Sequence, residues 1–268
     1  TPMTVWARYG SESPLKVLMW NHMAGSALTV LPGVNSVADL GGQTVAIPFW
    51  YSIHNVVLQH LLRDAGLEVT EQDPGPKQVK LIVMAPSDMV AALAAKSIAG
   101  FIVAEPFNAA AELQGVGKVL RFTGDVWRDH ACCVTVAHAA DVDQRPEWTQ
   151  KVANAMVKAQ LWTRENRAET AQLLSKDDPN KYTPHTAEIL SRVLAPEESD
   201  IAAYVASGAI RHPDWRERRI DFQPYPFPSY TEELVGMLKK TLVEGERGFL
   251  DALDPAFASG DLVDDRFV

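Results

Sequence analysis

A candidate binding site for a small anion follows the predicted strand at 43–48. The segment QTVAIPFWYSIHNVVLQHLLRDA begins at Gln43. Its pattern predicts a buried strand, a short aromatic loop and an amphipathic helix that opens at Ser52. The first turn of a helix carries unsatisfied backbone N–H groups, and the helix dipole also favours negative charge there. The segment therefore predicts a site for a small anionic or zwitterionic molecule.

Side chains around this turn are expected to complete the site. Ser52, His54 and Asn55 stand in the first turn, where they can hydrogen-bond the head group of a ligand. Trp50 and Tyr51 precede them and can form an aromatic wall. A structural alternative also fits the pattern: Ser52 is then only a helix cap, His54 is solvated, and the aromatic side chains belong to the core.

Two other strand ends carry residues that could contact the same ligand. Trp20 and Asn21 end an early strand, and the Asn21 amide can donate to a carboxylate or a sulfonate. Glu105 lies at the end of another strand, where it can contact a zwitterionic or cationic group or cap the following helix. We include all three among the predicted ligand-binding residues, with hinge packing as the alternative for Trp20.

Catalytic and metal-binding patterns find little support. The chain has no Gly-rich phosphate loop, no G-x-S-x-G and no H-E-x-x-H. His130, Cys132, Cys133 and His138 fit no common zinc spacing. Strand alternation should point the two adjacent cysteines to opposite faces, as small buried side chains. We therefore expect no catalytic residues, no metal and no cofactor.

The composition is that of an ordinary globular protein. The chain has 268 residues, of which 47% are hydrophobic and 22% charged, and its net charge is −9. Because it lacks a basic stripe, nucleic-acid binding is not expected. No window approaches the roughly 20 apolar residues of a membrane span. The sequence starts at Thr1 without an initiator Met, so we expect an upstream segment, such as a signal or a lost anchor.

Strands and helices alternate from Gln43 to Arg121, which indicates a mostly parallel sheet with helices on both faces. The strands are predicted at 15–20, 26–31, 43–48, 79–84, 101–104, 118–122 and 132–137. The helices are predicted at 52–65, 87–96, 107–113, 147–164, 168–174, 185–194, 197–206 and 229–243.

This order predicts two lobes. Residues 26–137 form an α/β lobe II, and residues 1–25 and 138–268 form a helix-rich lobe I. Two extended crossings, near 21–25 and 129–137, would join the lobes as a hinge around a cleft. Lobe I is short of strands, so we expect it to be incomplete in this chain.

The ordered phrases resemble a known family. SVADLGGQTVAIPFWYSIHNVVLQHLLRDAGLEV is similar to the first strand–helix unit of the second lobe in nitrate/sulfonate/taurine-type periplasmic solute-binding proteins of ABC importers. AALAAKSIAGFIVAEPFNAAAELQGVGKVL resembles the units that follow, and PLKVLMWNHMAGSALTVLPG the first hinge crossing. The resemblance implies the type II periplasmic-binding-protein fold, with two Rossmann-like lobes and a two-crossing hinge.

The same resemblance implies a function. The chain would bind a sulfonate, taurine, nitrate or a related solute outside the cytoplasm and deliver it to the membrane permease of an ABC transporter. The aromatic residues favour a larger solute, so binding of a pyrimidine or flavin vitamin precursor is an alternative. Two further hypotheses are an enzyme similar to a thiamin-pyrimidine synthase and a ligand-sensing domain of a regulatory protein.

Overall fold

The computed structural model describes residues 1–12, 14–212, 214–215 and 219–268, and it divides the chain into two compact units. Unit 1 contains Thr1–Met23, His130–Glu165 and Phe222–Val268, and unit 2 contains Ala24–Asp129 and Asn166–Asp221. Unit 2 thus groups residues 166–221 with the α/β segment, whereas the predicted lobe I includes them. The predicted lobe boundaries stay a prediction.

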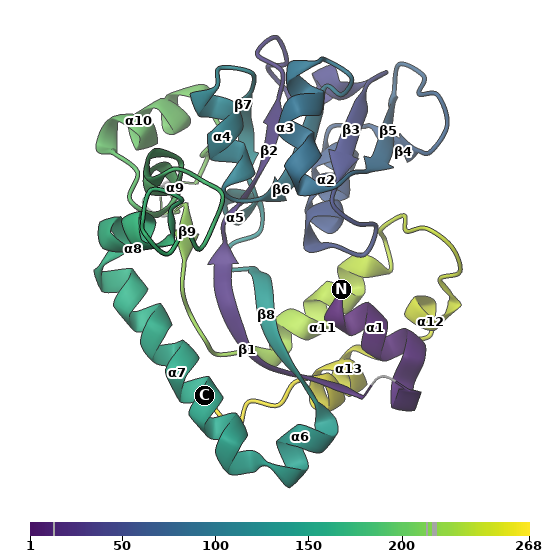
Figure 1. The fold of residues 1–268 in the computed structure, drawn as a ribbon. Helices are drawn as coiled ribbons and strands as arrows, with labels where there is room; N and C mark the ends of the chain where they lie inside the picture. Colours follow the sequence, from purple (N-terminus) through teal and green to yellow (C-terminus); the bar gives the residue numbers. More distant parts are fainter. Residues whose placement is uncertain (13, 213, 216–218) are drawn as a thin grey trace. The chain divides into compact units, whose positions relative to one another are not determined.

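Unit 2 is built on a six-stranded sheet, which gives the chain the expected α/β class (Figure 1). In sheet order, its strands are β4 (Glu68–Thr70), β5 (Gln78–Val83), β3 (Thr44–Ile47), β6 (Gly100–Ala104), β2 (Ser26–Val30) and β7 (Lys118–Phe122). Neighbours from β4 to β6 are parallel, but β2 runs antiparallel to both β6 and β7. The sheet is therefore mixed, with a parallel majority.

Unit 2 also contains several helices. They are η2 (Val37–Leu40), α2 (Ile53–Asp64), α3 (Pro86–Ala94), α4 (Phe107–Leu113), α5 (Thr123–Val126), α8 (Arg167–Leu174), α9 (Ala187–Leu194) and α10 (Glu198–Ser207), and the short strand β9 (Ile220–Asp221) ends the unit. Figure 1 shows α3 and α4 over one face of the sheet. Met89 and Leu93 of α3 and Ala111 of α4 pack there against Phe101 and Val103 of β6.

A second core in unit 2 forms where β2 and β7 meet the segment after α10. Phe122 packs edge-on against Tyr204, with ring centroids 4.8 Å apart, and lies 5.5 Å from Trp215. Gly124 approaches the Trp215 indole so closely that an added Cβ would lie 2.5 Å from a ring atom. A side chain at this position would therefore displace the tryptophan.

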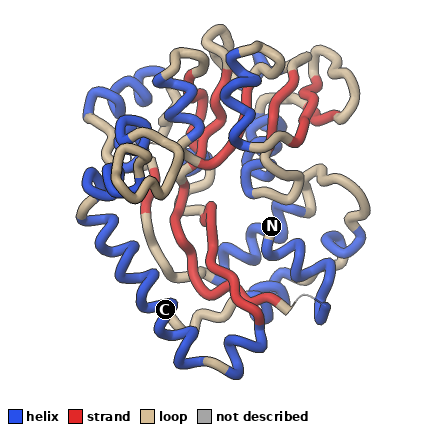
Figure 2. Tube along the Cα trace, in the orientation of Figure 1, coloured by secondary structure: helices blue, strands red, loops and turns tan. Residues whose placement is uncertain are grey.

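Unit 1 is helix-rich, with two long strands that pair antiparallel, and these strands stand out in red among blue helices in Figure 2. The strands are β1 (Leu15–Ala24), whose last residue already belongs to unit 2, and β8 (Ala131–His138). The helices are α1 (Pro2–Tyr9), η1 (Gly10–Glu12), α6 (Ala139–Gln144), α7 (Pro146–Glu165), α11 (Pro228–Leu238), α12 (Gly248–Asp251) and α13 (Pro255–Leu262).

The core of unit 1 joins segments that are distant in sequence. Leu18 and Met19 of β1 pack against Val142 of α6, Ala153 of α7 and Phe267 near the C-terminus. The main chain of β1 is also fixed from this side, because the Asp264 N–H donates to the Val17 carbonyl at 2.9 Å. The C-terminal residues therefore belong to the folded unit.

In the described part of the chain, no helix combines the length and the apolar character needed to cross a membrane.

Candidate solute site

The candidate site lies at one edge of the sheet of unit 2, where several strands end or begin. The parallel strands β3 and β6 end at this edge, and the antiparallel β2 begins there, with Ser26 paired to Ala104. The carboxyl edge of parallel strands is where open α/β folds bind ligands. The aromatic loop and the N-terminus of α2 follow β3 directly, so the predicted residues of this segment lie at this edge.

Ser52 caps helix α2. Its Oγ accepts a hydrogen bond from the Asn55 backbone N–H at 3.2 Å, as the structural alternative anticipates. The Asn55 side chain is buried and donates to the Trp50 carbonyl at 2.7 Å, while its Oδ1 accepts from Gln59 at 2.8 Å. Asn55 therefore fixes the aromatic loop to the helix. The Ser52 hydroxyl can still donate, because a hydroxyl carries one proton as well as its acceptor lone pairs.

His54 is not solvated. It is 8% exposed, and its Nε2 lies 3.0 Å from the Oγ of Ser26, which is itself 1% exposed. The Ser26 carbonyl accepts a hydrogen bond from the Thr123 hydroxyl at 3.1 Å, which ties α5 to the same point. We call Ser26, Ser52, His54 and Thr123 the edge cluster. No local sequence pattern marks Ser26 or Thr123 as part of the site, because only the pairing of β2 with β6 and β7 brings them to this edge.

The three aromatic residues before Ser52 differ in exposure. Trp50 and Tyr51 are 6% and 9% exposed, whereas Phe49 is 43% exposed. The rings of Phe49 and Tyr51 are tilted by 52° to each other, with their centroids 5.6 Å apart. The aromatic surface that faces solvent here is therefore mainly that of Phe49, a residue outside the predicted set.

Glu105 lies at the same edge, where its carboxylate forms a buried ion pair with Arg219. Its Oε1 accepts from Arg219 Nε at 2.6 Å, and its Oε2 accepts from the Ala109 N–H at 3.2 Å. Arg219 also donates to Glu112 at 3.1 Å and to the hydroxyl of Tyr204 at 2.8 Å. Glu105 therefore caps α4 and neutralises Arg219.

Burial and charge act in opposite directions within this ion pair. Burial raises the pKa of the Glu105 carboxyl, and the Arg219 guanidinium opposes the shift. Burial alone would lower the pKa of Arg219, but the carboxylates of Glu105 and Glu112 outweigh it, so this pKa rises. The carboxylate of Glu105 is therefore matched by a cation and adds no net negative charge to the edge.

Trp20 and Asn21 belong to unit 1 and are held by partners within that unit. The Trp20 ring lies edge-on to Tyr230 at 5.0 Å, and its carbonyl accepts from Gln160 at 2.8 Å. The Asn21 Oδ1 accepts from Thr135 at 2.6 Å. Trp20 is 3% exposed, so its contacts match the packing alternative.

Comparisons with known proteins identify the class of this chain. Residues 1–175 match the sequence model of the NMT1-like family. The nitrate/nitrite binding protein NrtA of Synechocystis sp. is 34% identical over 147 residues, which cover 54% of this chain and 32% of that protein. A putative aliphatic sulfonates-binding protein of Escherichia coli is 29% identical over 143 residues, or 53% of this chain and 42% of the relative.

A segment of this kind also occurs in an importer subunit. The nitrate import ATP-binding protein NrtC of Synechocystis sp. is 29% identical over 174 residues, which cover 60% of this chain and 25% of that protein. The matched segments thus span 25% to 42% of the length of these relatives.

Solved structures share the fold. The periplasmic nitrate-binding protein NrtA from Synechocystis PCC 6803 superposes with a TM-score of 0.74 at 20% identity, over 97% of this chain and 68% of that one. The desulfurization enzyme DSZB superposes with a TM-score of 0.53 at 15% identity, over 97% of this chain and 83% of the enzyme. The fold expected from the resemblance is confirmed, and it carries both binding proteins and an enzyme.

Proposed function

Since the chain belongs to the NMT1-like family, we propose that it is the extracytoplasmic, periplasmic solute-binding component of an ABC importer. Its solute is a small anion or zwitterion of the nitrate, sulfonate or taurine kind. Relatives named for binding nitrate, nitrite and aliphatic sulfonates support this class of solute. The segment shared with an ATP-binding importer subunit supports an ABC importer, with its membrane permease, as the partner.

The observation that carries the proposal is the edge cluster at the start of α2. Ser52 and His54 place a hydroxyl and an imidazole in the first turn of a 12-residue helix, and Ser26 adds a second hydroxyl. Helix N–H groups, hydroxyls and an imidazole are suited to an anion's oxygens. The nearby carboxylate of Glu105 does not repel such a ligand, because Arg219 is bound to it at 2.6 Å.

Access to the cluster requires a movement of the aromatic loop. Ser52 and His54 are each 8% exposed, and Trp50 and Tyr51 of the loop before them are buried as well. We propose that residues 49–51 shift when a solute enters, and that Phe49 then contacts the organic part of a sulfonate. Binding should therefore change the fluorescence of Trp50. This change is measured as the difference between the wild-type chain and a Trp50→Phe variant.

We favour binding over catalysis. Ser26 and His54 lie 3.0 Å apart, a distance that would suit a nucleophile and its base. However, Ser26 is 1% exposed, so its Oγ is shielded from solvent in this conformation. The matched relatives named above are binding or import proteins. The pair is therefore proposed to orient His54 toward a solute.

Thermal unfolding with candidate solutes tests the proposal, because a ligand that binds only the folded chain raises its Tm. Nitrate, taurine and ethanesulfonate represent the proposed class, and a pyrimidine and a flavin represent the heterocyclic alternative. We expect at least one anion to raise Tm. The shift should disappear in His54→Ala and persist in His60→Ala, which removes an exposed histidine of the same helix. The proposal fails if no anion raises Tm, or if His54→Ala retains the shift.

A further inference from the structure

Three potential metal ligands meet in unit 1, on the paired strands β1 and β8. One ligand atom each from His22, Cys132 and Cys133 can be chosen so that all three lie within 4.8 Å of one another. The Cys133 thiol is in hydrogen-bonding contact with both Cys132 and His22. Neither cysteine forms a disulfide within the described part of the chain; Cys132 is half-buried and Cys133 is exposed. The sequence prediction of two small buried side chains is therefore wrong for Cys133.

A break in the strand pairing brings the two thiols together. His22 pairs with Cys133 and Met23 pairs with Ala131, so Cys132 has no residue opposite it. One extra residue in one strand is the definition of a β-bulge, which re-aims side chains that would otherwise alternate. Simple alternation predicted opposite faces for Cys132 and Cys133. Because of the bulge, the two cysteine side chains do not alternate between the faces of the strand. The bulge depends on strand pairing, so the sequence alone does not identify His22 as their neighbour.

The imidazole of His22 has an unused buried nitrogen. Among the described residues, no hydrogen-bond partner reaches His22 Nδ1, although this atom is shielded from solvent. A buried polar atom without a partner is unfavourable, and in native structures it often marks a functional group. Since no hydrogen bond reaches Nδ1, the contact with Cys133 belongs to Nε2, and this nitrogen is the one placed to bind a cation together with the thiols.

We propose that His22, Cys132 and Cys133 bind one Zn²⁺ ion. Thiolate sulfur and imidazole nitrogen are the ligands that zinc prefers. Three protein ligands leave a fourth tetrahedral position, and the exposure of Cys133 places that position toward solvent. A site of this kind can hold a water molecule or an additional anion.

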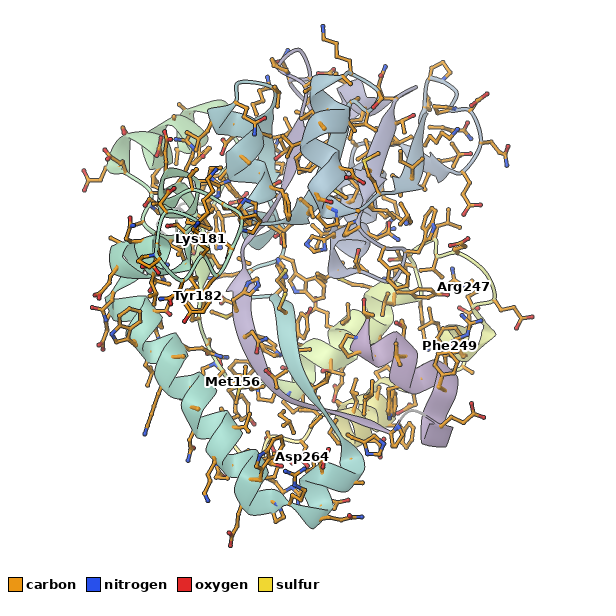
Figure 3. The ribbon with its side chains drawn as sticks, in the orientation of Figure 1. Met156, Lys181, Tyr182, Arg247, Phe249 and Asp264 are labelled. Atoms are coloured by element: carbon orange, nitrogen blue, oxygen red, sulfur yellow. The ribbon has the colours of Figure 1, made fainter. Side chains whose placement is uncertain are left out.

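Neighbouring groups hold the ligands in place. The Tyr230 hydroxyl donates to the Ala131 carbonyl at 3.0 Å, next to Cys132. Thr135 donates to Asn21, which precedes His22, at 2.6 Å. Thr135 also contacts the Met156 sulfur at 3.5 Å, and Figure 3 labels this side chain on α7. Such supporting contacts orient metal ligands.

Titration of the reduced chain with Co²⁺ tests the site, because thiolate ligands give cobalt a charge-transfer band in the near ultraviolet. We expect the band to saturate at one Co²⁺ per chain and to disappear when Zn²⁺ is added. Cys132→Ser, Cys133→Ser and His22→Gln should each weaken zinc binding by about tenfold or more, the size reported for a lost metal-site interaction. His138→Asn should bind normally, because asparagine can keep the helix-capping role of the exposed His138.

A second measurement covers variants that fold poorly. In the wild-type chain, Zn²⁺ should slow alkylation of the two cysteines by iodoacetamide, and a chelator should restore the rate. The proposal is overturned if no one-to-one complex forms or if zinc fails to protect the thiols. It is also overturned if a folded His22→Gln chain binds zinc as tightly as wild type, since two adjacent thiols alone would then hold the ion.

Discussion

The edge cluster of unit 2 and the zinc cluster of unit 1, His22 with Cys132 and Cys133, each contain a histidine at the end of a β-strand or the start of a helix. His54 has Ser26 as a hydrogen-bond partner at 3.0 Å. His22 instead contacts the thiol of Cys133. The partner of His54 is thus a hydroxyl group of the same sheet edge, whereas the partner of His22 is a potential metal ligand. The role of a buried polar residue is therefore inferred from its hydrogen-bond partners, because burial alone does not distinguish the two histidines.

The same contrast applies to the charged residues of the sheet edge. The sequence predicts that Glu105 contacts a ligand. In the structure, its carboxylate instead accepts a hydrogen bond from Arg219, which lies 114 residues later in the chain. The turn at Ser52 also satisfies part of its own hydrogen-bonding capacity through Asn55. Substitutions that remove one partner at a time distinguish two kinds of residue. Those paired within the protein should lower its stability when changed, and those that bind the ligand should weaken its binding.

The largest expected effect is that of Arg219→Met. This change leaves the buried carboxylate of Glu105 without the cation that pairs with it, and leaves Glu112 with Arg192 at 3.5 Å. Breaking a buried ion pair by removing one partner lowers the free energy of unfolding by about 3–5 kcal/mol. Urea denaturation measures this loss. The exposed pair Arg128–Asp214 is the control, because Arg128→Met should change stability by about 1 kcal/mol or less.

Asn55→Ala is expected to have the next largest effect. It removes the donor to the Trp50 carbonyl and the acceptor for Gln59 in a buried turn. Unsatisfied buried groups cost about 1–3 kcal/mol each, and relaxation of the loop offsets part of this, so we expect a loss of roughly 2–3 kcal/mol. The same urea experiment measures it. A loss below about 0.5 kcal/mol would contradict the assignment of Asn55 as the anchor of the aromatic loop.

Ser52→Ala should destabilise the chain by about 1 kcal/mol, because it removes the cap of α2. Ser52→Gly should cost only a few tenths of a kcal/mol, since glycine is tolerated at this position. If Ser52 also donates to the solute, both variants weaken solute binding to the same extent despite their different stabilities. A Ser52→Gly chain that binds solute like wild type would limit Ser52 to the capping role.

The smallest effect is expected for His22→Leu in the metal-free chain. This change removes a buried Nδ1 that has no hydrogen-bond partner together with a weak contact to the Cys133 thiol, so the free energy of unfolding should stay within about 0.5 kcal/mol of wild type. His54→Leu, in contrast, leaves Ser26 without its imidazole partner and should cost about 1–2 kcal/mol. Equal losses for the two leucine variants would remove the distinction between the two histidines.

Much of unit 2 could be predicted from the sequence, because its strands and helices follow regular hydrophobic periods. The segment from β3 to α2 is an example: the strand was expected at 43–48 and lies at Thr44–Ile47, and the helix opens after Ser52 as expected. The direction of β2 could not be predicted in this way. Periodicity identifies a strand but gives no information about which neighbour it pairs with or in which direction.

The candidate site was predictable only in part, for the same reason. The local signals around Ser52 come from adjacent residues, and the structure confirms the helix start. Ser26, Thr123 and Arg219 reach the edge through strand pairing and long connections, which leave no local pattern. The bulge opposite His22 is also a property of the pairing of two strands 108 or more residues apart, so alternation alone misplaced Cys132 and Cys133.

Isothermal titration calorimetry of the intact chain with taurine and with nitrate measures whether the edge cluster binds a solute. We expect at least one of the two to bind with a stoichiometry of one per chain. His54→Ala should abolish this binding, whereas His60→Ala, at a more exposed position of the same helix, should preserve it. Absence of heat from both solutes, or equal binding by the His54→Ala chain, would contradict the assignment of the edge cluster as the solute site.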